Sequence, residues 1–443
     1  MRNKIEWFVK SIFYPISLAA IAFLGWILKF SIPSAVIFSL MSFLPLFCHD
    51  GRGYVSLILL CPTMVYRPLN FKNLDISLII VASSIVLSVF IFTILRHPKF
   101  RLGKLTINLA VLFFVFVISL IVNSVSVEVL HLDTLWFLLC MILILLVYIL
   151  LTPLFCGKDI FIYFGKSFLI LVSVLAIQIF IYYGVKGVVG SSKDIELGWV
   201  QSTTMASTVL VISLPFCSMY INKKKWLAVI PMILSLVAIY VLRTESGLIC
   251  SILILIPLIF LTFKGYVHYP YFVISSFFVL SALLTVMVLV NDEFIQRVGD
   301  SLRYFGDFFK GKHESHKYGI EIFLTNPWIG GSINSLNVQD AGYIKLLDNT
   351  IITTLAMGGS IGLIAYVAFA IRIYILPFEI KTEGRLFFLV FLICGLIIGL
   401  IDNTFYNLYY LFILLLTTSC FESSSKDNIV DIKQDFYNNY IRA

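Results

Sequence analysis

Charged residues are scarce in this sequence of 443 residues, at 13% of the chain, whereas soluble domains carry about 25%. Hydrophobic residues make up 60%, including 40 Phe and 22 Tyr, and the mean hydropathy is +1.00. No soluble core of this size could bury so much apolar surface without leaving large apolar patches outside. The composition therefore predicts an integral membrane protein and excludes soluble enzymes, disordered proteins and small disulfide-rich scaffolds.

The sequence also lacks the short motifs that hold nucleotides, metals and disulfides. It contains no Walker A loop, no G-x-G-x-x-G, no H-E-x-x-H, no D-x-D and no C-x-x-C pair. Its eight cysteines lie in or at the ends of apolar segments, and we interpret them as small buried residues. We therefore expect no cofactor and no metal, so that any chemistry would be driven by the substrate itself.

Long apolar runs dominate what the sequence does contain. A membrane-spanning helix needs about 20 mostly apolar residues. Candidate spans lie at 11–28, 33–48, 53–66, 75–95, 105–123, 132–155, 166–183, 202–221, 226–242, 246–263, 271–290, 348–375, 386–402 and 405–421. The second and third are short enough to form a re-entrant pair, so we predict an all-α polytopic membrane bundle of about 12 to 14 transmembrane helices. The first run continues to Leu28, which favours a retained span over a cleaved signal peptide.

The Lys and Arg residues of the short connections indicate the orientation of the chain. Most of them fall on the same side of the membrane as the N-terminus, and such residues concentrate on the cytoplasmic side. Both termini are therefore predicted to be cytoplasmic. The predicted organisation is a transmembrane domain over 1–421, a large loop over 291–347 on the outer side of the membrane, and a cytoplasmic tail over 422–443.

The predicted loop at 291–347 combines basic, aromatic and histidine side chains. These are Arg297, Arg303, Phe305, Phe308, Phe309, Lys310, Lys312, His313, His316 and Lys317. The spacing of the three Phe residues places them on one face of a helix lying in the headgroup region, with cations on the other face. Such a helix could hold a lipid pyrophosphate, or it could simply cap the bundle.

Polar residues at the predicted outer boundary are further candidates. Trp328, in an Asn-Pro-Trp-Ile-Gly-Gly turn that follows an amphipathic stretch, could stack on a sugar ring or anchor the chain at the interface. Asp348 is a functional candidate or the N-cap of the next span. Arg243, between two adjacent spans, is a functional candidate or an ion-pair partner of Glu245. Asp402 is interpreted as an interfacial cap.

The late part of the chain resembles a known family. The layout of spans, the late outer loop ending in N-P-W-I-G-G and the following D-N-T-I-I-T-T-L-A-M-G-G-S-I-G are similar to those of bacterial O-antigen polymerases and O-antigen ligases, chiefly over 195–365. Residues of matching kind are Asn326, Pro327, Gly330, Gly331, Gly358, Gly359 and Gly362. The segment 242–248, with Arg243, Ser246 and Gly247, is similar to a short outer motif of that group, although order and spacing differ.

One departure from the family favours the polymerases. The ligases usually begin the span after the loop with H-N-x-x-L, whereas this chain has Asp348 before Asn349 and Ile352. The arginine that ligases often carry about a dozen residues before N-P is also unmatched here. The resemblance therefore implies an O-antigen polymerase whose base remains open between His313, His316 and Asp348.

The resemblance implies a metal-independent glycosyltransferase of the bacterial inner membrane, acting on its periplasmic face. A growing undecaprenyl-pyrophosphate-linked oligosaccharide would be attacked by a hydroxyl of the next lipid-linked repeat. Cations must hold the leaving pyrophosphate, and we assign this role to Arg243 and Arg303, supported by Arg297 and Lys317. His316 is the first candidate base and Asp348 the second. Partners would be membrane lipid, a flippase and a chain-length regulator, and not nucleic acid.

Three other functions fit parts of the sequence. An O-antigen ligase would use the same donor and transfer the chain to lipid A-core. A lipid-linked oligosaccharide flippase or other secondary transporter suits the number of spans, but it would place charges at the bilayer midplane. A non-catalytic envelope assembly protein is disfavoured by the cations and histidines of the loop.

Overall fold

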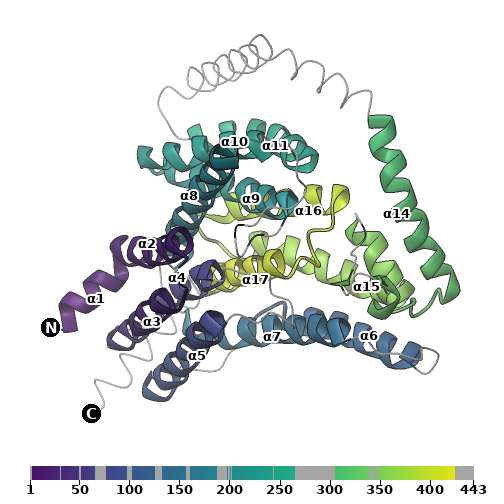
Figure 1. The fold of residues 1–443 in the computed structure, drawn as a ribbon, viewed down its shortest axis with the longest axis horizontal. Helices are drawn as coiled ribbons and strands as arrows, with labels where there is room; N and C mark the ends of the chain where they lie inside the picture. The colour runs from purple at the N-terminus through teal and green to yellow at the C-terminus, as the bar shows by residue number, and fades with distance from the viewer. Residues whose placement is uncertain are drawn as a thin grey trace, which may run out of the picture.

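The computed structural model of the chain is a bundle of α-helices (Figure 1). It describes residues 2–29, 31–48, 51–64, 76–96, 102–124, 132–155, 160–186, 197, 200, 202–242, 244–264, 305–338, 343–344, 347 and 349–424.

Helices form nearly all of the regular structure in these ranges. The α-helices are α1 (Arg2–Lys10), α2 (Phe13–Leu28), α3 (Ser31–Met41), α4 (Arg52–Leu60), α5 (Ile76–Arg96), α6 (Thr106–Ser124), α7 (Leu132–Leu154), α8 (Ile160–Lys186), α9 (Thr203–Asn222), α10 (Val229–Leu242), α11 (Glu245–Phe263), α14 (Phe305–Thr325), α15 (Thr350–Glu379), α16 (Arg385–Ile401) and α17 (Leu408–Ser423). Short 3-10 turns are η1 (Leu44–Phe47), η2 (Cys61–Met64), η4 (Trp226–Ala228) and η5 (Ile333–Leu336). A two-stranded antiparallel ribbon pairs β1 (Asn337–Val338) with β2 (Tyr343–Ile344).

Six of the described helices are long and apolar enough to cross a membrane, which confirms a polytopic helical bundle. They lie at Thr106–Asn123, Thr134–Leu154, Ile160–Gly184, Thr203–Asn222, Ser246–Phe263 and Thr350–Glu379. The pair Asn3–Lys10 and Phe13–Leu28, bent by 68°, would add a seventh span. Five further apolar helices are shorter, and the predicted span at 271–290 lies outside the described residues. The predicted number of 12 to 14 spans is therefore not reached within the part of the chain that the structure describes.

The second and third predicted spans are short helices, as their length suggested. At a rise of about 1.5 Å per residue, the 9-residue α4 covers only about 14 Å, half of a hydrocarbon core of about 30 Å. Every residue of α4 from Gly53 to Leu60 is buried, and the helix packs against α2 and α8. A helix end at this depth is tolerated because protein, not lipid, surrounds it.

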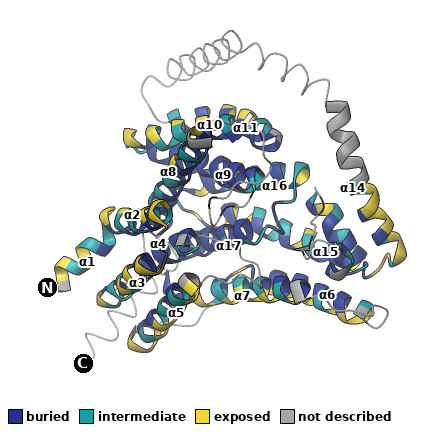
Figure 2. Cartoon of the chain, viewed as in Figure 1, coloured by how far each residue is buried: buried dark blue, intermediate teal, exposed yellow. Residues whose placement is uncertain are grey.

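Helix α9 lies inside the bundle, in contact with α8, α10, α11 and α16 (Figure 2). Many of its buried side chains are small hydroxyls, which allow neighbouring helices to approach closely. Several of these hydroxyls bond to their own helix, as Thr208 does to the Thr204 carbonyl at 2.8 Å and Ser213 to the Leu210 carbonyl at 2.6 Å. The interior of the bundle is therefore close-packed although much of this helix is not aliphatic.

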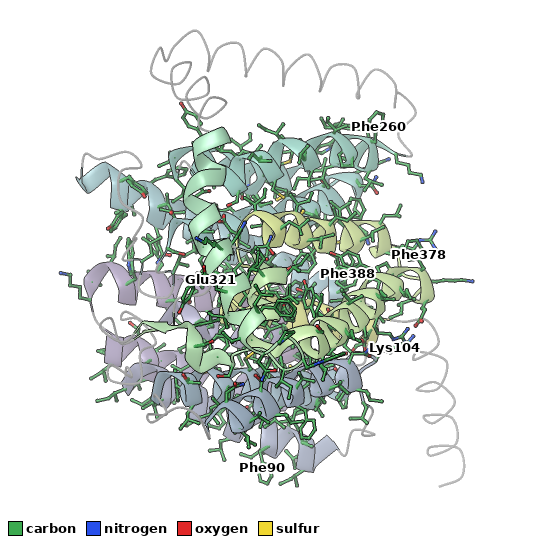
Figure 3. The ribbon with its side chains drawn as sticks, turned by 90° about the vertical axis from the view of Figure 1, so that its right-hand side faces the viewer. Phe90, Lys104, Phe260, Glu321, Phe378 and Phe388 are labelled. Carbon is green, nitrogen blue, oxygen red and sulfur yellow. The ribbon has the colours of Figure 1, made fainter. Side chains whose placement is uncertain are left out.

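The outer surface of the bundle is largely apolar. Phe90, Phe260 and Phe378 project from the periphery, whereas Phe388 is fully buried and stacks on Phe421 with ring centroids 4.2 Å apart (Figure 3). Exposed aromatic and aliphatic side chains in such numbers fit a lipid environment rather than water. The protein is therefore membrane-embedded, while the type of membrane and the orientation stay predictions.

Two ends of the bundle differ in chemistry. At one, here called the charged end, Lys104 pairs with Glu379 at 2.8 Å and Lys223 pairs with Glu383 at 2.7 Å. At the other, here called the polar end, uncharged side chains cap the helices: Ser202 caps α9, Asn349 caps α15 and Asn407 caps α17. Cations that the sequence assigns to the cytoplasmic side thus gather at the charged end.

A buried carboxylate organises the charged end. Glu422, near the end of α17, accepts a hydrogen bond from the Tyr148 hydroxyl at 2.8 Å and another from the Lys104 backbone N–H at 3.0 Å. The Tyr148 hydroxyl also accepts a bond from the Leu105 N–H at 3.3 Å. Lys104 in turn reaches Glu379, which also pairs with Arg372. These contacts tie α6, α7, α15 and α17 together.

We expect Tyr148→Phe to destabilise the protein by about 1 to 3 kcal/mol, because it removes the hydroxyl that donates to the buried Glu422 carboxylate and accepts from the buried Leu105 N–H. The thermal unfolding midpoint of the purified protein in detergent measures this loss. Glu383→Gln is the matched control: Glu383 is exposed, and surface ion pairs contribute about 0 to 1 kcal/mol. Equal midpoints for the two variants would contradict the role given to Glu422.

Candidate functional site

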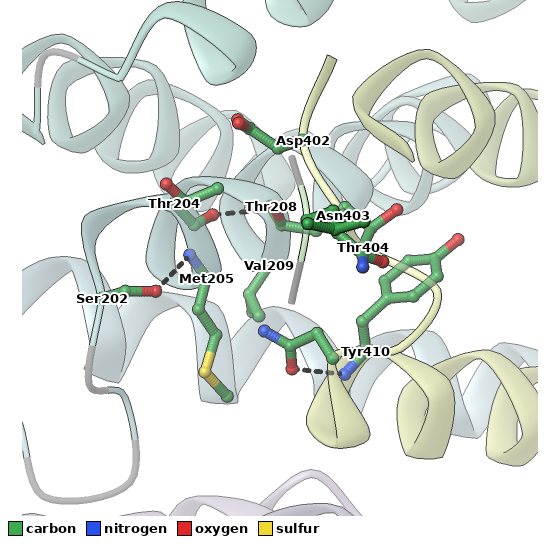
Figure 4. A pocket seen from close by; sticks show the side chains of 11 residues that line it. Ser202, Thr204, Met205, Thr208, Val209, Asp402, Asn403, Thr404 and Tyr410 are labelled. Carbon is green, nitrogen blue, oxygen red and sulfur yellow. Dashed lines mark hydrogen bonds between the residues drawn. The ribbon is translucent and has the colours of Figure 1, made fainter. Parts of the chain in front are cut away.

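A cavity of about 180 Å³ opens at the polar end of the bundle (Figure 4). Its lining is mostly uncharged and polar. The lining residues are Ser202, Thr204, Met205, Thr208, Val209, Leu347, Asp402, Asn403, Thr404, Asn407 and Tyr410. We call this cavity the polar pocket.

One wall of the polar pocket is the first turn of α9. Ser202 takes an extended conformation before the helix, and its side chain accepts a hydrogen bond from the Met205 N–H at 3.1 Å. This cap fixes the start of the helix, which places Thr204 and Thr208 one turn apart on the same face. The wall therefore presents hydroxyl groups at helical spacing.

The opposite wall is the connection between α16 and α17. Asn403 donates to the Thr353 hydroxyl at 2.8 Å, which ties this connection to the first turn of α15. Asn407 accepts bonds from the Tyr409 and Tyr410 N–H groups at 3.1 and 3.3 Å and thereby caps α17. Asp402 supplies the carboxylate in this lining. Hydroxyls, amides and a carboxylate together suit a ligand rich in hydroxyl groups, such as a sugar.

A second, apolar hollow adjoins the polar pocket. It measures about 70 Å³, lies between α15, α16 and α17, and includes Tyr366, Phe369 and Phe405 in its lining. Thr404 and Tyr410 line both hollows. The polar end therefore offers adjoining polar and apolar surfaces, an arrangement that suits a ligand with a polar head and an apolar chain.

Helix α15 breaks next to this site. Gly359 has φ 61° and ψ −155°, a conformation that essentially only glycine adopts, so the helical hydrogen bonding is interrupted there. The freed groups find partners in the turn at 326–331. The Ser360 N–H donates to the Pro327 carbonyl at 2.9 Å, and the Gly331 N–H donates to the Ala356 carbonyl at 2.8 Å. The Asn-Pro-Trp-Ile-Gly-Gly turn at 326–331 thus supplies backbone hydrogen-bond partners for the groups released by the break in α15.

Hydrogen bonds to the turn at 326–331 fix the backbone of Trp328. The Trp328 carbonyl accepts a bond from the Ile361 N–H at 3.2 Å, and Asn123 of α6 donates to the Gly330 carbonyl at 3.0 Å. Trp328 is 71% exposed. An exposed indole on a fixed backbone suits both predicted roles of Trp328, which are to stack on a sugar ring or to anchor the chain at the membrane interface.

Helix α14 carries the other predicted residues that are described. It packs on α15 at Gly319, where a Cβ atom would lie 2.5 Å from Ile352 Cγ2 and would also meet Leu347, a lining residue of the polar pocket. His316 is half-buried and lies three residues earlier, on the same face of α14. Lys317 is exposed, and its Nζ lies 3.9 Å from Glu321. The structure therefore brings His316, and not Lys317, to the face of α14 that packs toward the pocket.

Several predicted site residues lie outside the described residues: Arg243, Arg297, Arg303 and Asp348. His313 lies on α14, although its side chain is not described. One prediction is wrong by a residue. The N-cap of α15 is Asn349, whose side chain accepts bonds from the Ile351 and Ile352 N–H groups at 2.8 and 3.2 Å, and not Asp348.

Sequence reasoning missed most of the polar pocket. It passed over Ser202, Thr204, Thr208, Asn403 and Asn407. It named Asp402 as a boundary residue that could be an interfacial cap, and in the structure Asp402 both ends α16 and lines the pocket. The available signal was a cluster of uncharged polar residues in two short connections between apolar runs. Such clusters usually serve as helix caps, and here they do that as well as lining the cavity.

No protein-family model matches the chain, and no curated protein matches it significantly. Within the described residues there is no group of three or more His, Cys, Asp or Glu side chains that could hold a metal ion. The assignment of a function therefore depends on the site itself and on the resemblance noted above.

We expect Gly359→Ala to destabilise the protein by about 2 kcal/mol or more, because an added Cβ combines a positive φ with a contact to the Trp328 carbonyl. At Gly359 that Cβ would lie 2.5 Å from the Trp328 C and O atoms. Gly362→Ala, three residues on in α15, meets only ordinary contacts from 3.4 Å and is expected to be tolerated. The thermal unfolding midpoints of the two variants in detergent measure the difference. A Gly359→Ala variant as stable as wild type would contradict a break in α15 that is stabilised by the turn at 326–331.

Proposed function

We propose that this protein is a polysaccharide polymerase that joins undecaprenyl-pyrophosphate-linked oligosaccharide repeats, as in the O-antigen polymerases that its late segments resemble. The observation that carries the proposal is the polar pocket adjoining an apolar hollow at the polar end of a membrane bundle. A lipid-linked saccharide has the same division between a hydroxyl-rich head and an apolar chain. The exposed Trp328 on its fixed backbone offers a further surface for a sugar ring.

In the proposed reaction, a sugar hydroxyl of the new repeat attacks the anomeric carbon of the growing chain. The bond between that carbon and the pyrophosphate oxygen breaks, and undecaprenyl pyrophosphate leaves. A base takes the hydroxyl proton. His316 is the first candidate because histidine has an unperturbed pKa of about 6.5 and this residue lies on the α14 face that packs toward the pocket. Asp348 and His313 remain alternatives.

Charge develops on the leaving pyrophosphate, so the site needs cations or oriented donors there. Arg243 and Arg303 are proposed for this role, with Arg297 and Lys317 in support. The reaction would take place at the periplasmic face of the bacterial inner membrane, with both termini cytoplasmic. A flippase would supply the lipid-linked repeats, and a chain-length regulator would act on the product.

An O-antigen ligase is the closest alternative, since it would use the same donor. A flippase or other secondary transporter is less well supported. The ion pairs Lys104–Glu379 and Lys223–Glu383 lie at one end of the bundle, and Lys317–Glu321 lies on the exposed face of α14. Transporters instead place ionisable groups near the midplane. The polar pocket, in which Asp402 is the charged residue of the lining, lies at the end opposite Lys104 and Lys223.

Deletion of the gene in its own host is expected to leave lipopolysaccharide with core plus a single repeat and no ladder on a silver-stained gel. Export and ligation of one repeat do not need the polymerase, so that product persists. Bare core would instead point to a ligase or a flippase. An unchanged ladder would remove the protein from this pathway.

His316→Ala, expressed in the deletion strain, is expected to lower polymer formation by about 100-fold or more, the range that loss of a general base gives. Glu321→Gln is the control, because Glu321 is exposed and lies on the same helix. Both proteins should reach the wild-type level in membranes by immunoblot. A full ladder from His316→Ala would exclude His316 as the base.

A further inference from the structure

Three consecutive lysines form the turn between α9 and α10 at the charged end of the bundle. They are Lys223, Lys224 and Lys225. Lys223 pairs at 2.7 Å with Glu383, which lies in the connection between α15 and α16. Lys224 and Lys225 are exposed, and neither forms an ion pair within the part of the chain that the structure describes. Two adjacent positive charges are therefore exposed at this end.

Hydrogen bonds fix the backbone of this turn. The Lys224 N–H donates to the Ile221 carbonyl at 2.8 Å, and the Lys225 N–H donates to the Tyr220 carbonyl at 3.0 Å. Lys224 has φ 61°, a left-handed conformation that is uncommon for residues other than glycine. The Lys225 ammonium lies 5.8 Å from the centre of the Tyr220 ring, within the range of a cation–π contact. Both lysines are therefore placed at the end of α9.

An exposed apolar stripe begins directly after the lysines and follows α10. It consists of Leu227, Ile230, Ile233 and Val237, all of them exposed and Leu227 to 81%. Their spacing of three to four residues places them on one face, whereas Ser235 and Ile239 on the other face are buried. At about 1.5 Å per residue the stripe is about 15 Å long, half of a hydrocarbon core of about 30 Å. This is the depth of one leaflet.

Trp226 lies between the lysines and the stripe and is 50% exposed. Tryptophan side chains concentrate at the headgroup level of membranes, where one part of the ring is apolar and the other polar. Lysines, tryptophan and apolar stripe thus follow one another in the order of the phosphate, the interface and the acyl chains of a phospholipid. Lysines that only set the orientation of the chain need no such neighbours.

We infer that the turn at 223–226 and the exposed face of α10 bind an anionic phospholipid, with its phosphate at Lys224 and Lys225 and an acyl chain along the stripe. Each ammonium group offers three donors to phosphate oxygens, and anionic headgroups attract basic residues at the membrane surface. The occupant is a lipid of the surrounding leaflet. It is distinct from the proposed saccharide substrate, whose polar pocket lies at the other end of the bundle, so the inference does not depend on the proposed function.

The test uses the full-length protein in detergent micelles, with dioleoyl phosphatidylglycerol, dioleoyl phosphatidylcholine and glycerol 3-phosphate as separate probes. A ligand that binds only the folded protein raises its thermal unfolding midpoint. We expect phosphatidylglycerol to raise the midpoint more than phosphatidylcholine, which has the same acyl chains and no net charge. The double variant Lys224→Gln and Lys225→Gln should need at least about tenfold more phosphatidylglycerol for the same rise.

The matched control is the double variant Lys381→Gln and Arg385→Gln. Both residues are exposed and lie where the chain passes from α15 to α16, so this variant removes the same charge from the same end of the bundle. It should respond to phosphatidylglycerol as wild type does. The variant Lys224→Arg and Lys225→Arg keeps the charge and should also respond as wild type, which separates loss of charge from damage to the turn.

Equal rises with phosphatidylglycerol and phosphatidylcholine would overturn the inference, as would a Lys224→Gln and Lys225→Gln variant that responds like wild type. An equal loss in the Lys381→Gln and Arg385→Gln variant would assign the effect to the general charge of this end and would refute a site at the turn. Loss of the response in the arginine variant would refute the role of charge. A rise with glycerol 3-phosphate as large as that with phosphatidylglycerol would refute the role of the acyl chain and the stripe.

Discussion

A helix that breaks inside an apolar bundle must find partners for the backbone groups it releases, because lipid and aliphatic side chains offer none. Helix α15 breaks at Gly359, and the turn at 326–331 supplies those partners through Pro327, Trp328 and Gly331. The rest of the polar end depends on these hydrogen bonds between the break in α15 and the turn at 326–331. It fixes where α14 ends, sets the direction of the Thr350–Gly358 half of α15, and so fixes the wall that Thr353 shares with Asn403 beside the polar pocket.

Close approach of helices is the second requirement, and small residues provide it. Glycines at 247, 319 and 358 each lie against a neighbouring element, namely Ser207 of α9, Leu347 before α15 and Phe116 of α6. Larger residues would push these elements apart and open the polar end. Small residues also leave room for hydroxyl groups between helices. The hydroxyls of Thr208 and Ser213 bond to their own helix, whereas those of Ser218, Thr244 and Ser246 have no hydrogen-bond partner within the described residues.

Much of the fold followed from local sequence. The apolar runs predicted the long helices, and Asn326 and Pro327 predicted the turn after α14. The break at Gly359 could not be predicted in this way, because glycines in an apolar run also mark close helix packing, and the groups that stabilise the interruption lie in the distant turn at 326–331. The polar pocket was equally hidden, since residues 202–209 and 402–410 meet only in the folded chain. At Asp348 and Asn349 the error was one residue, because both types are good caps.

The hydrogen bonds that Glu422 accepts from Tyr148 and Lys104 affect how the chain assembles. The Glu422 carboxylate lies on α17, the last described helix, while its donors lie on α6 and α7, which are synthesised nearly three hundred residues earlier. Until α17 arrives, the Tyr148 hydroxyl and the Lys104 N–H lack the acceptor that they have in the finished bundle. Completion of the charged end is thus a late event in biogenesis, and a nascent chain stopped before Glu422 would present a recognisable defect to membrane quality control.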